Sequence, residues 1–349
     1  MKLLILGGTR FLGHHIAAAA RARGHELTLF HRRKHGLAVD RDIETITGDR
    51  NLDLSKLRGR QWEAVIDTCG YFPDSVRASA EALAESVERY VFISTVSVYA
   101  DFSECGMNES SPVVTLSDDD VNRARTIDAS GPVSAATYGS LYGGLKVLCE
   151  RAAEEVLPGR VLSVRPGVIV GPYDYTDRLT WWVARVARGG EVLAPGRPGR
   201  HLQFIDVRDL SEWVVAAIEQ RQAGLFNATG PAETVTMAGL LETCRTISGS
   251  DARFTWASEQ FLLDEQVTPW TEMPLWLPEE ALPRKRGFMA ISSQKALDAG
   301  LRDRSLDETV GDLHRWHAGE PQGRTLHAGL PPDREQQLLE RWHSVRDVC

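Results

Sequence analysis

The feature that most constrains this chain is a glycine turn that starts at its seventh residue. The apolar run Lys2–Leu6 leads into Gly7-Gly8-Thr9-Arg10-Phe11-Leu12-Gly13, and an Ala-rich helical pattern follows. In a strand, tight turn and helix of this kind, the free N–H groups of the helix start favour a pyrophosphate. Gly7 allows the tight turn, and Gly13 allows close packing of the helix on the strand. The motif therefore predicts a dinucleotide site contacted by Gly7, Thr9, Arg10, Phe11, Leu12 and Gly13.

Strand and helix patterns alternate through the first half of the chain. The expected strands are Lys2–Leu6, Glu26–His31, 64–67, 90–94, 161–165 and Val168–Val170, and the expected helices are 11–23, 74–87 and 142–157. Strands separated by helices of this length indicate βαβ units and a parallel sheet. The predicted fold class is α/β: a Rossmann-type doubly wound parallel sheet with a smaller α/β C-terminal substrate domain.

Breaks in this alternation suggest the domain boundaries. Residues 101–137 hold Asp118-Asp119-Asp120 and scattered Ser and Pro, which favours a long loop or insertion. The pattern loosens beyond Gly171, with helices expected at 181–188, 210–220, 237–247 and 333–345. We therefore expect a dinucleotide-binding domain at 1–170, to which part of 204–230 returns, a mainly substrate-binding domain at 171–316, and a polar C-terminal extension at 317–349.

Composition narrows the classes of partner. The chain has 48 acidic and 40 basic side chains and a formal net charge of −8, which disfavours a nucleic-acid partner. No apolar run approaches the roughly 20 residues that span a bilayer, and Gly-Gly-Thr-Arg interrupts the apolar N-terminus, unlike a signal peptide. Five cysteines without CxxC spacing disfavour a disulfide framework and a zinc site. These observations predict a reduced, cytoplasmic protein with no membrane segment, no metal site and a small-molecule substrate.

The end of the second strand bears on cofactor choice. The segment Leu29-Phe30-His31-Arg32-Arg33-Lys34 places a histidine and cations where NAD-preferring sites usually place Asp or Glu. Arg32 or Arg33 would attract a 2′-phosphate through the forked geometry of guanidinium, so NADP(H) is favoured and NAD(H) is the alternative. A solvated basic turn is the competing interpretation. We assign His31, Arg32 and Arg33 to the cofactor, together with Asp49, which could accept from the adenine amine, and its neighbour Arg50.

Two segments carry candidate acid/base chemistry. Tyr142 and Lys146 are four residues apart on an expected helix, which places the phenol and the ammonium on one face. A tyrosine pKa near about 10 is too high for general acid/base work at neutrality, and a nearby ammonium favours the phenolate. Tyr138 lacks a lysine at the same spacing. Thr95 and Ser97 follow an expected strand, where a hydroxyl can hydrogen-bond a substrate oxygen or simply form a turn.

In their order along the chain, these segments resemble the extended short-chain dehydrogenase/reductase family, in its epimerase/dehydratase branch. The resemblance continues through Arg165-Pro166-Gly167, Val170-Gly171-Pro172 and 204–210, and covers about residues 1–315. It implies that Tyr142 and Lys146 are the catalytic pair and that Thr95 is the catalytic hydroxyl. It also implies that Cys69, Gly70 and Pro166 line the cofactor, and that a homodimer forms through the helix of Tyr142. Arg10 in place of the middle glycine marks an atypical subgroup.

The resemblance leaves several reactions open. Dehydratases and decarboxylases of the family usually carry a carboxylate one or two residues after the threonine, where this chain has Val96 and Ser97, so dehydration is disfavoured. The basic strand end favours an NADP(H)-dependent oxidoreductase that transfers hydride between nicotinamide and a carbonyl or hydroxyl group. The alternatives are an NAD-retaining sugar-nucleotide epimerase and a non-catalytic, cofactor-sensing or RNA-associated protein.

The substrate side is less defined by the sequence. Sugar-nucleotide members of the family hold the diphosphate and base with comparable segments, which points to a glycosylated or nucleotide-linked carbonyl compound. The candidate substrate residues are Ser97, Arg178, Trp182, Arg200 and Gln203. Surface arginines and a core tryptophan are the competing interpretation.

Overall fold

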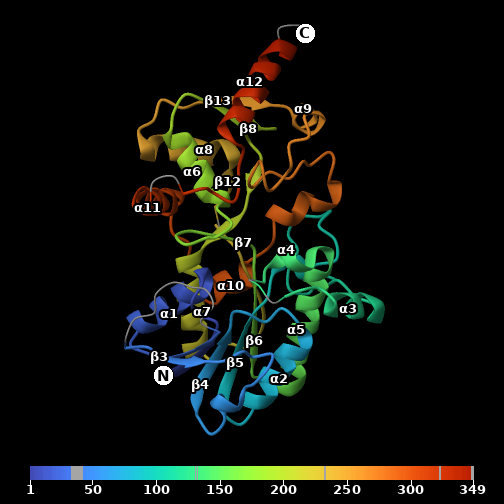
Figure 1. Cartoon of the computed structure of the whole chain (residues 1–349), viewed down its shortest axis with the longest axis vertical. Coiled ribbons are helices and arrows are strands. Elements are labelled where there is room, and N and C mark those ends of the chain that lie inside the picture. Colours follow the sequence, from blue (N-terminus) through green and yellow to red (C-terminus); the bar gives the residue numbers. More distant parts are fainter. Residues whose placement is uncertain (33–41, 130, 132, 232, 322–323, 347–349) are drawn as a thin grey trace.

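The chain forms two packed units that lie one above the other along its long axis (Figure 1). The structure is a computed structural model that describes residues 1–32, 42–129, 131, 133–231, 233–321 and 324–346. The lower unit holds the N-terminus and a large sheet, and the upper unit holds the C-terminal helix. None of the described helices is long and apolar enough to cross a membrane.

A seven-stranded parallel sheet forms the lower unit. Its strands follow the order β11-β6-β5-β4-β1-β2-β3. Their bounds are β1 Lys2–Leu6, β2 Glu26–His31, β3 Glu44–Thr47, β4 Trp62–Asp67, β5 Val87–Ile93, β6 Val161–Pro166 and β11 Gly224–Ala228. The winding reverses beside β1, which pairs with β2 on one side and β4 on the other. Ligands bind at such a reversal, beyond the carboxyl ends of the strands. The predicted doubly wound α/β fold is confirmed.

Helices cover both faces of this sheet. α1 (Phe11–Ala22) and α7 (Val207–Glu219) pack with Leu3 and Ile5 of β1. α2 (Pro73–Leu83) and α5 (Tyr142–Val156) pack with Leu4 and Leu6 on the opposite face. Successive side chains of a strand point to opposite faces. A strand covered on both sides therefore reads as a continuous apolar run, which makes β1 easy to predict from the sequence.

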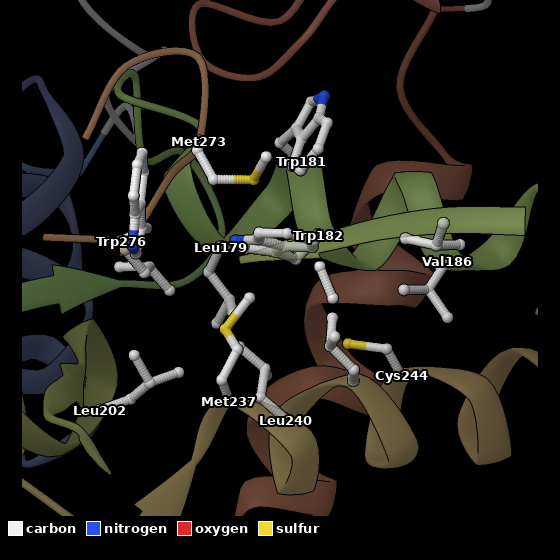
Figure 2. Packing of buried hydrophobic residues seen from close by; sticks show 14 of the residues in the cluster. Leu179, Trp181, Trp182, Val186, Leu202, Met237, Leu240, Cys244, Met273 and Trp276 are labelled. Carbon is white, nitrogen blue, oxygen red and sulfur yellow. The ribbon is translucent and has the colours of Figure 1, made fainter. Parts of the chain in front are cut away.

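The upper unit is built from short strand pairs and helices around one core. β7 (Val168–Val170) pairs with β10 (Phe204–Asp206), β8 (Glu191–Pro195) with β13 (Arg253–Ala257), and β9 (His201–Leu202) with β12 (Val235–Thr236). The helices are α6 (Arg178–Ala187), α8 (Met237–Ser248), α9 (Glu259–Asp264) and α11 (Leu306–Ala318). The short helix α10 (Gln294–Asp298) packs instead against β11 of the lower unit. Short 3-10 turns occur at Ser55–Leu57, Val96–Val98, Gly139–Leu141 and Pro283–Met289. Figure 2 shows Trp182 among the side chains of α6 and α8 that form the core.

The segment 101–137 is not the unstructured loop that its composition predicts. It contains α3 (Asp118–Arg125) and the first residues of α4 (Ala135–Tyr138). Ser117 caps α3 by accepting the N–H of Asp120, whose carboxylate accepts the Ser117 N–H and hydroxyl in return. Such a capping box, with carboxylates in the first turn, stabilises a helix start. The Asp run that suggested a loop is therefore a helix N-terminus.

The C-terminal segment is an integral part of the upper unit rather than a polar extension. Its helix α12 (Pro332–Arg346) places Leu338 and Leu339 in the core. The Glu335 carboxylate lies 2.5 Å from Nε of Arg185 and accepts the N–H of Leu193 at 3.1 Å. The sequence hid this role because the buried face of α12 is narrow within a polar segment.

Candidate active site

The glycine turn between β1 and α1 has a backbone that only glycine adopts easily. Gly7 and Gly8 have φ values of 104° and 86°, a region that side chains disfavour. Gly13 lies on α1, where an added Cβ would stand 2.8 Å from the backbone of Gly8. The turn is therefore held against the helix start by three glycines, of which the sequence predicts the roles of Gly7 and Gly13.

The start of α1 presents backbone donors to a cavity. No side chain caps the helix at its N-cap residue Arg10, and its first turn holds no acidic residue. The first N–H groups of a helix lack partners within it and carry partial positive charge, so they suit an anion such as a pyrophosphate. The described residues present here therefore fit a dinucleotide cofactor.

One cavity of about 360 Å³ joins this turn to the predicted acid/base residues. Of the predicted cofactor residues, its wall includes Gly7, Thr9, Arg10, Phe11, Leu12, Gly13, His31, Arg32, Asp49, Arg50, Cys69, Tyr142, Lys146 and Pro166. Thr95 also lines it. Arg33 lies outside the described residues. The candidate cofactor residues and the candidate catalytic residues thus share one site at the carboxyl edge of the sheet.

Lys146 is buried on the first turns of α5. Its side chain is only 3% exposed, and Nζ donates to the carbonyl oxygens of Gly70 at 2.7 Å and Ile93 at 2.6 Å. Nζ also lies 4.2 Å from the ring centroid of Phe92, a favourable cation–π position. Burial lowers the pKa of Lys146, while neighbouring thiol and carboxylate groups oppose this shift. The ammonium is therefore held in a fixed place by two strand-end carbonyls.

Tyr142 opens α5, one turn before Lys146. Burial raises the pKa of its phenol above the ordinary value, and a hydrogen bond with the Thr95 side chain partly opposes the increase. Thr95 follows β5, and its Oγ1 accepts the N–H of Ser97 at 3.1 Å. The ring of Tyr71 lies 6.3 Å from that of Tyr142, between centroids. Tyr142, Thr95 and Lys146, predicted from separate motifs, thus meet at one wall of the cavity.

The end of β2 presents a cation to the same cavity. Arg32 donates to the carbonyl of Gly131 at 3.3 Å, and its Nη1 lies 3.9 Å from a carboxylate oxygen of Asp49. Asp49 is fixed in turn by the N–H of Asn51. The strand end itself carries His31 rather than an acid, so a ribose at this position would meet both a guanidinium and the Asp49 carboxylate.

Two of the predicted cofactor residues have a different role from the one expected. Arg50 is engaged in a buried ion pair with Asp67, 2.5 Å between Nη1 and Oδ1. Its other terminal nitrogen donates to Ser79 Oγ at 2.8 Å, so both terminal nitrogens of Arg50 are engaged within the protein. Gly70 lies beneath the cavity wall, where its carbonyl accepts from Lys146. Cys69 does line the cavity, and burial raises the pKa of its thiol.

Most of the predicted substrate residues are engaged elsewhere. Trp182 is fully buried in the core of the upper unit (Figure 2). Its indole N–H donates to the carbonyl of Pro274, so its assignment to a substrate pocket is wrong. Gln203 exchanges hydrogen bonds with the backbone of Ile291 in both directions, which explains its position without a substrate. Arg200 is 5% exposed and pairs with Glu259 at 2.8 Å.

Arg178 and Ser97 stay predictions. The guanidinium of Arg178 stacks on Trp270, 4.9 Å from the ring centroid. Ser97 lies beside Thr95, whose hydroxyl donates to it at 3.2 Å. Neither residue is among the described residues that line the cavity.

Tyr71 and Tyr175 line the cavity but were not predicted from the sequence. Tyr71 directly follows the Cys69-Gly70 segment at the end of β4, and this adjacency was a usable signal. Tyr175 lies in the loop before α6, with the guanidinium of Arg10 4.4 Å from its ring centroid. No local pattern joins Arg10 to Tyr175, because only the fold brings the two units together there.

The comparisons with known proteins bear on the family and the fold of this chain. A model of the NAD dependent epimerase/dehydratase family matches residues 75–228. Over this segment the chain is similar to that family. The matched segment spans from α2 to β11 and so includes Thr95, Tyr142 and Lys146.

Two curated relatives extend the similarity over most of the chain. The chain is 26% identical over 269 residues to the "Chloroplast stem-loop binding protein of 41 kDa b, chloroplastic" of Arabidopsis thaliana, covering 71% of this chain and 63% of that protein. It thus spans less than two thirds of the plant relative. It is 25% identical over 309 residues to the "Epimerase family protein SDR39U1" of Bos taurus, covering 85% of this chain and 92% of that one.

Solved structures support the fold. UDP-glucuronic acid 4-epimerase from Bacillus cereus, in complex with NAD, aligns with a TM-score of 0.62 at 16% identity, covering 94% of this chain and 100% of that one. This chain and that epimerase therefore share an overall fold.

Proposed function

We propose that this protein is an NADP(H)-dependent oxidoreductase of the extended short-chain dehydrogenase/reductase type, acting on a carbonyl/hydroxyl pair of a small molecule. The observation that carries the proposal is the meeting of Tyr142, Lys146 and Thr95 in the cavity that the glycine turn also lines. A protein that only bound a nucleotide would have no need of a buried lysine one helical turn from a partly buried tyrosine in the cavity wall.

Each of these residues has a distinct role in the proposed reaction. A bound nicotinamide cofactor would supply or accept the hydride. The Thr95 hydroxyl, at the carboxyl end of β5, would hold the substrate oxygen toward Tyr142. Tyr142 would give a proton to that oxygen during reduction or remove it during oxidation. Lys146, fixed by the carbonyls of Gly70 and Ile93, would stabilise the phenolate form.

The preference for NADP(H) rests on Arg32. It lines the cavity at the end of β2, where the last strand residue is His31 rather than an acid. A guanidinium binds a phosphate through paired donors. The nearby Asp49 carboxylate would meet the ribose or adenine and would also orient Arg32.

The second candidate is an NAD-retaining sugar-nucleotide epimerase. The Bacillus cereus structure, an epimerase in complex with NAD, favours it. Against it stand the engagement of Arg200 with Glu259 and of Gln203 with Ile291, which leaves fewer free groups for a nucleotide diphosphate. The plant relative is named for stem-loop binding, which keeps an RNA-associated role as a third candidate.

Cofactor identity and retention separate these candidates. The purified protein would be denatured and the released nucleotide identified, and stripped protein would be titrated with NADPH and NADH by nicotinamide fluorescence. An empty site that prefers NADPH supports the reductase. Tight, co-purified NAD would overturn the NADP(H) assignment and place the epimerase first. RNA binding that survives removal of the cofactor and replacement of Tyr142 would favour the third candidate.

We also propose a homodimer formed through α5, as the family resemblance implies. The solution mass would test it: a monomer at all concentrations used for activity measurements would exclude the dimer.

A further inference from the structure

A buried ion pair between the ends of β3 and β4 adjoins the cavity, with Arg50 in the cavity wall and Asp67 behind it. Arg50 and Asp67 are 8% and 0% exposed, and their closest atoms are 2.5 Å apart. Arg50 is fixed further by the carbonyl of Ser75 at 3.0 Å and by Ser79 Oγ at 2.8 Å. The desolvation of two buried charges can cancel the free energy gained from their attraction, so a buried ion pair need not stabilise the fold. We therefore ask which groups this pair holds in position.

The Asp67 carboxylate fixes the backbone that follows β4. Its Oδ1 accepts the N–H of Cys69 at 3.1 Å, and its Oδ2 accepts the hydroxyl of Tyr90 at 2.8 Å. The next residue, Gly70, is packed so closely that an added Cβ would stand 2.9 Å from Asp67 Oδ2 and 2.7 Å from Phe92. The Cys69-Gly70 backbone therefore rests directly on the carboxylate and has little freedom to move.

This same backbone holds Lys146. The Gly70 carbonyl accepts from Nζ at 2.7 Å, and Ile93 provides the second acceptor. The ion pair, the Cys69-Gly70 backbone and the lysine thus form one continuous set of interactions from β3 to α5. None of these interactions uses Tyr142 or the cofactor turn directly.

We propose that Asp67, with Arg50 as its counter-ion, is a positioning residue that sets the place of the Lys146 ammonium through the Gly70 carbonyl. The inference rests on the function proposed above for Tyr142 and Lys146. It assigns Arg50 a structural link to the acid/base pair in place of the cofactor contact that the sequence suggested.

The charges around both groups shape the test. Burial has the largest effect on the pKa of Lys146. The titratable groups that act on the Lys146 ammonium are Cys149, Asp67, Glu150 and Arg50. Tyr142 is faced by Thr95, Tyr175 and Cys149. Replacing Asp67 alone would leave Arg50 buried and unpaired and would change the local charge. The double variant Arg50→Met/Asp67→Asn removes both charges, so any effect on Tyr142 reflects position rather than net charge.

The readout is the titration of Tyr142 in the NADP⁺ complex, followed by near-ultraviolet tyrosinate absorbance and corrected by subtracting the Tyr142→Phe variant. We expect Arg50→Met/Asp67→Asn to move the midpoint upward by about one pH unit, equivalent to roughly tenfold less phenolate at a given pH. Arg50→Lys keeps the charge but lacks the forked donors that reach Ser75 and Ser79, and we expect a smaller shift in the same direction. If the double variant does not fold, the titration of the Arg50→Lys variant alone tests the proposal.

The matched control is Arg185→Met/Glu335→Gln. This pair has almost the same burial, 8% and 4% exposed, but lies in the upper unit. An unchanged midpoint in both Arg50 variants, or an equal shift in the control, would overturn the inference. Absence of any Tyr142 titration in the wild-type complex, or failure to bind NADP⁺, would overturn the proposed function and this inference with it.

Discussion

At the scale of single residues, Tyr142 combines a partly buried phenol with a lysine one helical turn away. Burial raises its pKa, so the protonated form prevails at neutral pH without cofactor. In the proposed reaction, the positive charge of an oxidised nicotinamide, added to that of Lys146, would stabilise the phenolate. Reduction needs the protonated form, so its rate should be constant at low pH and fall as pH rises through the pKa of the complex. Oxidation needs the phenolate and should show the opposite trend. The pH profiles measured in both directions check these signs.

Removal of the phenol oxygen should affect turnover far more than binding. Tyr142→Phe is expected to lower kcat by about 10²- to 10⁴-fold, the usual contribution of a positioned acid/base group. NADPH affinity should stay within about twofold of the wild type, because a single hydroxyl is removed from a large binding surface. Tyr138→Phe is the matched control, since Tyr138 lines the same cavity without a lysine at the same spacing. Equal losses in both variants would contradict the assignment.

Arg32 should decide cofactor preference. Because Arg32→Ala removes the guanidinium that would bind the 2′-phosphate, it is expected to weaken NADPH binding by about tenfold, the value of one charge-assisted interaction, and NADH binding by at most about twofold. Fluorescence titration of both nucleotides measures the ratio. Arg60→Ala, which removes an exposed arginine paired with Glu44, should change neither. A parallel decrease of NADH affinity in Arg32→Ala would argue against an interaction with the 2′-phosphate.

The sequence was informative about residues whose chemistry depends on local spacing, and uninformative about residues whose partners are distant. Tyr142 and Lys146 could be paired because four positions on a helix bring them to one face. Arg50 was assigned to the cofactor because it follows Asp49, but its true partner, Asp67, lies on the next strand of the chain. Trp182 was assigned to a substrate pocket, although only the fold shows that α6 turns it into the core.

At the scale of elements, the junction of β1 and α1 depends on glycine at a helical position. Gly13→Ala would place a methyl 2.8 Å from the Gly8 backbone. Since neither backbone can yield easily, we expect a decrease of about 1–3 kcal/mol in stability from overpacking. NADPH affinity should fall by at least about tenfold, the equivalent of 1.4 kcal/mol in binding, because the turn must move. Nucleotide titration and chemical denaturation measure the two effects.

Gly311→Ala is the control at an equivalent position in another helix. Gly311 lies in α11, where an added Cβ would meet nothing nearer than 3.7 Å. The change should therefore be neutral, or stabilising by up to about 1 kcal/mol through helix propensity. Impaired NADPH binding in Gly311→Ala, or retention of full affinity in Gly13→Ala, would contradict the close-packing argument.

The bounds of helices and strands could be predicted where the apolar pattern of the sequence was regular, and they were less accurate where it was not. The strands Lys2–Leu6, Glu26–His31 and Val168–Val170 have the expected bounds. By contrast, α2 ends at Leu83, and β5 begins at Val87, where the helix was expected to end. The helix α3 was missed because three consecutive aspartates read as a loop, although Ser117 and Asp120 form its capping box.

At the scale of the whole molecule, the cavity and the upper-unit core are separate. The described wall of the cavity extends no further along the chain than Tyr175, whereas the upper core draws on residues from Val168 to Leu339. Changes in the upper core should therefore reduce stability without changing the cofactor site. Sequence analysis anticipated two units but treated the last segment as an extension, because a polar helix with one narrow apolar face gives little signal.

Glu335 provides the test of this separation. Glu335→Gln would leave the Arg185 guanidinium buried without its carboxylate, and breaking one partner of a buried pair costs about 3–5 kcal/mol. The double variant Arg185→Met/Glu335→Gln removes the unpaired charge and should recover most of that stability. Denaturant unfolding measures the difference, while NADPH titration under native conditions should give the same affinity for all three proteins. A folded Glu335→Gln protein that no longer binds NADPH would show that the upper core and the cofactor site are coupled.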